Sequence, residues 1–106
     1  MEICYILDAS AFINGFKMLS NNNFTVPEIT AEIKDFESRL VFDMACDEGK
    51  LIIQDADSSY VSEVERIISS SGDVLRLSLP DKKLIALADM LSQQGKNVKV
   101  ISDEQS

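Results

Sequence analysis

The chain has 106 residues, of which 45% are hydrophobic, and a formal net charge of −8 at pH 7. This length suits one globular domain, because roughly two-thirds of the unfolded surface can be buried at this size. No apolar run approaches the roughly 18 residues of a membrane span. The start, Met1-Glu2, lacks the basic residues of a signal peptide. We therefore expect a cytoplasmic protein without a membrane partner.

Cysteine content and charge narrow the kind of site further. Cys4 and Cys46 lie far apart within predicted apolar faces, so we interpret them as buried hydrophobes rather than as parts of a disulfide framework or zinc ribbon. The acidic balance argues against a nucleic-acid partner, because phosphate binding usually requires a basic surface. This charge is still compatible with an acidic metal-dependent nuclease. Without four site acids the chain has 14 acids and 10 bases, so its remaining net charge is −4.

The first half of the chain predicts alternating strands and helices. An apolar run at residues 3–8 predicts a strand buried on both faces, and residues 9–18 carry Phe12, Ile13 and Phe16 at helical spacing. The polar run at residues 20–23 predicts a loop. Two further helices are expected, one opened by Pro27 and one over residues 36–48 that stops at Gly49. A short strand at Thr25-Val26 and an apolar stripe of Leu40, Val41, Met44 and Ala45 complete this half.

The second half continues the same alternation. Residues 51–53 predict another buried strand, and Ser58-Ser59 can cap a helix that ends in the run 69–72. A last helix is expected after Ser78 and a last strand over residues 98–101. The residues expected to face inward are Val61, Val64, Ile67, Ile68, Leu84, Ile85, Leu87, Ala88 and Leu91. Strands separated by helices predict an α/β fold with a mainly parallel sheet, whose ligands bind beyond the carboxyl ends of the strands.

Four acids lie at the edges of these elements. Asp8 and Asp103 directly follow the apolar runs ICYIL and VKVIS at opposite ends of the sequence, and Glu32 and Asp81 lie in the early parts of two predicted helices. If the two strands are parallel neighbours, their carboxylates meet. Carboxylates without histidine are hard oxygen ligands, which suit Mg²⁺ or Mn²⁺ rather than zinc. The pattern indicates a divalent-metal site for phosphodiester chemistry.

Each acid also has a purely structural interpretation. Asp8 can cap the helix that follows it, and Glu32 can be a solvent-facing helix residue. Asp81 lies three residues after Ser78, close to a capping-box spacing, and Asp103 can simply end a strand. Four unrelated roles explain the joint placement less easily than one site does.

Four segments carry a resemblance to a known family: YILDASAFING, TVPEITAEIKDFESR, LSLPDKKLIALA and VISDE. In this order they resemble the PIN-domain ribonucleases over nearly the whole chain. The second segment is most similar to the archaeal and eukaryal Nin-one-binding endonucleases, which mature small-subunit ribosomal RNA. The resemblance implies a PIN-like three-layer α/β/α fold around a mainly parallel sheet, with an acidic site for one or two Mg²⁺ or Mn²⁺ ions.

Residue by residue, the resemblance implies that Asp8, Glu32, Asp81 and Asp103 are catalytic metal ligands and that Ser10 supports them. Two departures from the family pattern concern the end of the chain. Glu104 stands where the family commonly has a second aspartate. Residues 1–106 are also expected to form a single PIN-like domain without its last helix and strand, and without the zinc ribbon of the ribosomal relatives.

The function expected from the resemblance is metal-assisted hydrolysis of RNA, with ribosomal RNA precursors or the pre-ribosome as candidate partners. Lys34, Arg39 and Lys82 are candidate phosphate contacts, as is Lys17, while Phe12, Phe16 and Phe36 are expected in the core rather than stacked on bases. Two alternatives stay open: a catalytically silent PIN-like module inside a larger assembly, and a toxin-type PIN nuclease. A homodimer is compatible with either.

Overall fold

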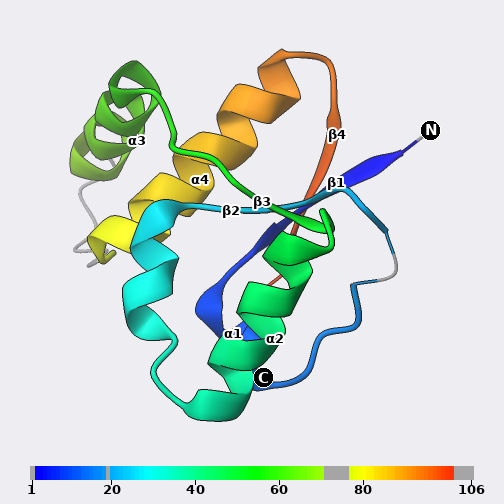
Figure 1. Ribbon diagram of the computed structural model, residues 1–106. Helices are drawn as coiled ribbons and strands as arrows, with labels where there is room; N and C mark the ends of the chain where they lie inside the picture. The colour runs from blue at the N-terminus through cyan, green and yellow to red at the C-terminus, as the bar shows by residue number, and fades with distance from the viewer. Residues whose placement is uncertain (1, 19, 71–76, 102–106) are drawn as a thin grey trace.

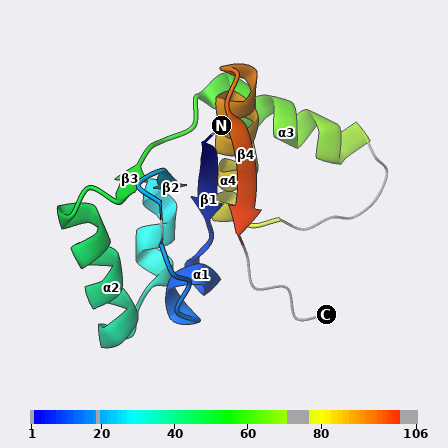
Figure 2. The same cartoon turned by 90° about the vertical axis from the view of Figure 1, so that its right-hand side faces the viewer.

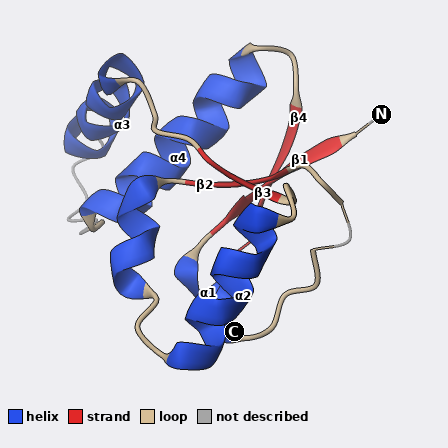
Figure 3. Ribbon diagram, in the orientation of Figure 1, coloured by secondary structure: helices blue, strands red, loops and turns tan. Residues whose placement is uncertain are grey.

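A computed structural model describes residues 2–18, 20–70 and 77–101 of the chain (Figure 1). Strands and helices alternate through the described residues, as the sequence predicts, and loops join them (Figure 3). The elements in order are β1 (Ile3–Leu7), α1 (Ala9–Ile13), β2 (Asn23–Thr25), the 3-10 helix η1 (Pro27–Glu32), α2 (Phe36–Asp47), β3 (Leu51–Ile53), α3 (Ser58–Ser70), α4 (Leu79–Gln93) and β4 (Asn97–Ile101).

The four described strands form one sheet in the order β3-β2-β1-β4, and every pairing is parallel. The helices α3 and α4 lie on one side of this sheet and α1 and α2 on the other (Figures 1 and 2). The α/β prediction with a parallel sheet is therefore confirmed. No helix in the described part of the chain is both long and apolar enough to span a membrane.

The core lies where β1 meets α4 and η1. Ile6 and Leu7 of β1 are fully buried, as are Ile29 of η1 and Leu87 of α4. Helix α4 buries Leu84, Leu87 and Leu91, a spacing of three and four residues that keeps them on one face. Helix α4 thus packs against both β1 and η1, and the described candidate acids Asp8, Glu32 and Asp81 lie on or beside these three elements.

Polar caps and glycines set the helix boundaries. The Asp35 side chain accepts a hydrogen bond from the Ser38 N–H at 3.0 Å and so begins α2. Gly49, with φ of 75°, directly follows the C-cap of that helix, because the left-handed conformation is cheapest for glycine. These local signals explain why the predicted limits of α2, residues 36–48, agree with the structure to within one residue.

The predicted helix over residues 9–18 is too long. Helix α1 stops at Ile13, and Gly15 then adopts φ of 75°, which redirects the chain. Phe16 and Met18 consequently lie in the connection to β2 rather than on a helix face. The helix opened by Pro27 is also shorter than expected, because it is a single 3-10 segment that ends at Glu32.

Several predicted core positions are wrong because the tertiary packing uses other faces. Helix α2 buries Ser38, Phe42 and Ala45, so Leu40, Val41 and Met44 are exposed. Strand β3 is at the sheet edge, which leaves Ile52 and Ile53 exposed. The other exposed positions predicted to be buried are Ile13, Phe36, Ile67 and Ile85. Cys4 is buried as expected, Cys46 is only half-buried, and the predicted helix end at residues 69–72 extends beyond the described residues.

Candidate active site

Asp8 lies at the carboxyl end of the central strand β1. Its N–H donates to the Ile101 carbonyl oxygen at 3.1 Å, so the ladder between β1 and β4 reaches this residue. Its Oδ1 accepts the Ala9 N–H at 2.7 Å, which makes Asp8 the N-cap of α1. The capping interpretation is thus correct, but it does not exclude metal binding, because an ionised carboxylate has roughly four acceptor positions.

Two polar residues stand beside this strand end. Thr25 is fully buried on β2, and its hydroxyl donates to the Leu7 carbonyl oxygen at 2.8 Å, directly before Asp8. This bond adds to the strand ladder and holds the backbone that presents the carboxylate. The one sequence signal for Thr25 is a polar residue between the apolar residues Phe24 and Val26. Ser10 is half-buried in α1, two residues beyond Asp8.

Glu32 and Asp81 approach Asp8 from two other elements. Glu32 is the last residue of η1, and Asp81 lies in the first turn of α4, where its N–H donates to the Ser78 hydroxyl oxygen at 3.3 Å. Glu32 is exposed, as its solvent-facing interpretation predicted, but some loss of solvent around its carboxylate raises its pKa, and the negative charges of Asp8 and Asp81 raise it further. Three acids far apart in the sequence therefore share one electrostatic environment.

The described acids alone do not complete a chelating group. No three acids, cysteines or histidines within residues 2–18, 20–70 and 77–101 are close enough together to hold one ion. Asp103 and Glu104 lie outside the described residues. The donor chemistry nevertheless fits a hard divalent cation, because the converging groups are carboxylates whose mutual repulsion a cation would relieve.

A lysine near these acids connects the elements that carry them. The Lys83 ammonium on α4 lies 3.4 Å from Oε2 of Glu28 on η1 and 2.7 Å from Oδ1 of Asp55, which follows β3. The Lys83 side chain is only 16% exposed. The bridge fixes η1, which ends in Glu32, against α4, which carries Asp81. No local sequence pattern predicts this role, because Glu28, Asp55 and Lys83 come from three distant segments.

The predicted phosphate contacts differ in their surroundings. Arg39 pairs with Asp43 at 3.5 Å, and Lys82 pairs with Glu65 at 3.4 Å. Such exposed pairs are weak, so they compete little with a phosphate. Lys34 is exposed and forms no ion pair with another described residue. The role of all three in RNA binding stays a prediction.

Comparison with known proteins agrees with the motifs and the fold. Residues 5–91 match the family model of the PIN domain of ribonuclease. The chain is 45% identical over 100 residues to endoribonuclease Nob1 of Methanothermobacter thermautotrophicus, which covers 93% of this chain and 57% of that protein. It is 34% identical over 85 residues to endoribonuclease Nob1 of Methanocaldococcus jannaschii, which covers 78% of this chain and 41% of the relative.

Other archaeal relatives give the same result. Endoribonuclease Nob1 of Archaeoglobus fulgidus is 31% identical over 100 residues, covering 94% of this chain and 57% of the relative. The chain spans about half the length of the curated relatives it matches. The family match covers most of the parallel sheet and the three converging acids, and so the chain belongs to the PIN-domain ribonuclease family and is similar to Nob1.

Proposed function

We propose that this chain is a divalent-metal-dependent endoribonuclease that hydrolyses RNA phosphodiester bonds. One observation carries the proposal: Asp8, Glu32 and Asp81 converge beyond the carboxyl end of a parallel sheet in a PIN-domain chain. The names of the relatives, all endoribonucleases, support the same reaction class. We further propose a ribosomal RNA precursor as the substrate, since the motifs resemble the ribosomal group of the family.

We assign the acids different roles according to their positions. Asp8, at the end of the central strand β1, and Asp81, at the start of α4, are the proposed principal ligands of Mg²⁺ or Mn²⁺, with Asp103 and Glu104 as further candidates. Such an ion supplies Lewis-acid stabilisation of the negative charge that develops on the phosphate. Glu32 has a pKa that the charges of Asp8 and Asp81 help to raise, so it is suited to accept a proton from the attacking water.

A serine nucleophile does not fit this site. Serine is usually activated by a neighbouring histidine, and the chain contains none. Ser10 and Thr25 instead support Asp8 through its local backbone and helix. Direct attack by water is therefore the proposed route.

The decisive experiment is cleavage of labelled single-stranded RNA in Mn²⁺ or Mg²⁺, with EDTA as the metal-free arm. Asp8→Asn is expected to lower the rate by more than about tenfold, because it removes a ligand charge at nearly unchanged volume. Asp47→Asn, an exposed acid at the end of α2, is the matched control and should cleave normally. Equal rates for the two variants would contradict the assignment of Asp8.

Melting temperature separates the enzyme from a silent module. An ion that binds only the folded state at a hundred times its dissociation constant stabilises it by about 2.7 kcal/mol, which raises the melting temperature on the order of 10 °C. We expect this shift with Mn²⁺ for the unmodified chain and its loss in Asp8→Asn. RNA binding with neither cleavage nor a Mn²⁺ shift would instead favour the binding-module alternative.

A further inference from the structure

A second feature lies on the sheet next to the acids. A cavity of about 230 Å³ opens at β1 and β4, lined among others by Tyr5, Phe16, Lys17, Lys99 and Ile101. Tyr5 and Lys99 are register partners on adjacent parallel strands, so their side chains project from the same face of the sheet. The connection after α1 closes the cavity with Phe16 and Lys17.

This cavity is adjacent to the candidate active site. The carbonyl oxygen of Ile101, one of the lining residues, accepts the N–H of Asp8. Tyr5 precedes Asp8 by three residues, which is roughly 10 Å along an extended strand. A nucleic-acid strand that crosses the acids along β1 would therefore pass over the cavity.

The charge of the cavity is opposite to that of the protein. The chain carries 18 acids and 10 bases, yet among the described residues no acid lines this cavity and two lysines do. Five of the described cations form ion pairs with described acids, but Lys17 and Lys99 form none with a described residue. An otherwise acidic protein needs local unpaired positive charge to bind a phosphate backbone.

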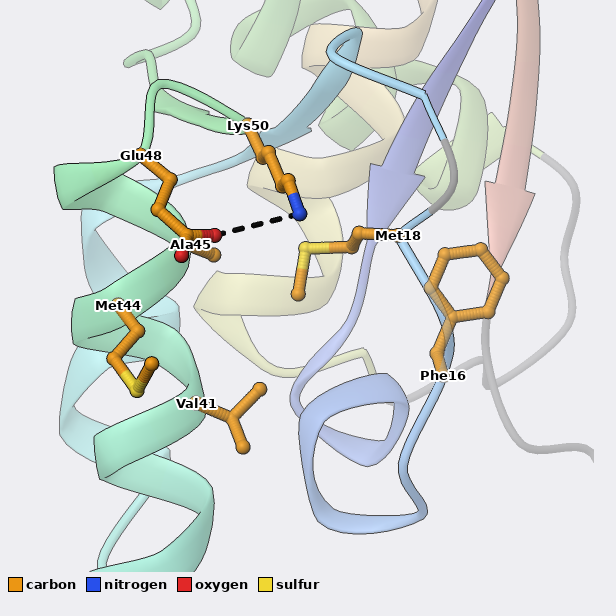
Figure 4. A pocket seen from close by; sticks show the side chains of 7 residues that line it. All are labelled: Phe16, Met18, Val41, Met44, Ala45, Glu48 and Lys50. Carbon is orange, nitrogen blue, oxygen red and sulfur yellow. Dashed lines mark ion pairs between the residues drawn. The ribbon is translucent and has the colours of Figure 1, made fainter.

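A neighbouring cavity provides the contrast. It shares Phe16 but is walled by α2, with Val41 and Met44 across from the ring (Figure 4). Its lysine, Lys50, is paired with Glu48 at 3.4 Å. That cavity therefore offers apolar surface without unpaired positive charge, whereas the cavity at β1 and β4 combines both.

Two aromatic rings provide apolar surface in the cavity at β1 and β4. The ring centroids of Tyr5 and Phe16 are 6.1 Å apart, and the ring planes are inclined by 54°. Both side chains are half-buried, so each keeps part of its surface accessible. Single-stranded nucleic acid is typically bound by such rings, on which bases stack, together with basic groups along the backbone. Phe16 packs half-buried against the core, as predicted, but from the connection after α1 and not from a helix.

We propose that this cavity binds one unpaired base of the single-stranded RNA next to the scissile bond. Tyr5 and Phe16 contact the base, and Lys17 and Lys99 bind the flanking phosphates. The volume suits a single base, because it is below the roughly 300 Å³ at which pockets for drug-sized ligands begin. This inference rests on the proposed RNA substrate, but it concerns binding and not the chemical step.

The test measures binding in EDTA, where cleavage does not interfere. The probe is a fluorescein-labelled single-stranded oligouridine, followed by anisotropy over a series of salt concentrations, with its duplex with oligoadenosine as the paired form. Lys99→Ala should weaken binding and reduce the salt slope by about 0.7, the contribution of one contact to single-stranded nucleic acid. Lys96→Ala, which removes the same charge beside the amino end of β4, is the matched control and should leave the slope unchanged.

The aromatic contact has its own matched pair. Phe16→Leu keeps apolar packing but removes the ring, and should weaken binding about fivefold or more. Phe36→Leu makes the same change at a ring that is 79% exposed and outside the cavity, and should have no effect. The fluorescence of Tyr5 reports on the cavity directly. Tyr60→Phe leaves Tyr5 as the only tyrosine in a chain without tryptophan. Bound oligouridine should then quench the remaining emission.

Three results would overturn the proposal: equal salt slopes for Lys99→Ala and Lys96→Ala, equal affinities for Phe16→Leu and Phe36→Leu, or equally tight binding of the duplex. Circular dichroism of each variant verifies that it is folded. Failure of the proposed function gives a different pattern, in which the unmodified chain binds oligouridine with these differences but does not cleave it in Mn²⁺.

Discussion

The bridge at Lys83 offers the sharpest test of how the site is held together. Lys83→Met removes the ammonium but keeps a long apolar side chain, so the packing of the stem is largely preserved. Glu28 then loses its cation while Oε1, which has no hydrogen-bond partner among the described residues, stays buried. The loss should loosen η1 from α4.

The magnitude follows from the exposure of the three groups. The Lys83 and Glu28 side chains are 16% and 28% exposed, and leaving a largely buried polar group without its partner costs roughly 1–3 kcal/mol, or more for a charged group. Asp55 is 60% exposed, so solvent reduces its pairing with Lys83 to at most about 1 kcal/mol. We expect Lys83→Met to lower the free energy of unfolding by about 2–3 kcal/mol.

Urea denaturation followed by circular dichroism measures this change. Lys82→Met is the matched control, because its partner Glu65 is 51% exposed and the pair should contribute about 0.5 kcal/mol or less. A double-mutant cycle with Glu28→Gln should give a coupling energy above about 1 kcal/mol between positions 28 and 83. Equal destabilisation by the two lysine variants, or a coupling near zero, would refute the reasoning.

Two further predictions concern stability. Asn23→Ala should cost roughly 2–4 kcal/mol in urea denaturation, because the fully buried amide donates to two backbone carbonyl oxygens at 2.6 and 3.1 Å. Asn22→Ala, which loses only an exposed bond to Glu2, should stay within about 0.5 kcal/mol. A hydrogen bond from Lys83 lowers the pKa of Asp55 below 3.8, so this contribution is present at neutral pH and lost as the pH falls through about 4 and below. Asp55→Asn should therefore show a smaller stability loss between neutral pH and pH 3, and an unchanged acid dependence would contradict this prediction.

Local patterns determined much of the fold. The limits of α2 follow from the Asp35 cap and Gly49, and those of β4 from an apolar run after Gly95, because these signals act within one or two turns of the chain. Parallel topology followed from the alternation of strands and helices. The approach of Asp8, Glu32 and Asp81 to one another could be predicted from the sequence as well, because each acid stands at a predictable element boundary.

Long-range packing decided the rest. Nothing within α2 selects Phe42 over Leu40 for the core, because both lie on apolar stretches and only the position of the sheet distinguishes them. Ile52 and Ile53 of β3 are exposed because the strand is at an edge, whereas Leu51 stays buried.

The same holds for contacts between distant segments. The bridge from Lys83 to Glu28 and Asp55 joins three segments that lie far apart in the sequence. No local sequence pattern therefore predicts it. The cavity of Tyr5, Phe16 and Lys99 depends on the register of β1 with β4 and on the turn at Gly15. The sequence by itself thus determined which elements form and where the acids stand on them. The tertiary structure decided which side chains meet, because strand register and helix rotation depend on the packing of the whole core.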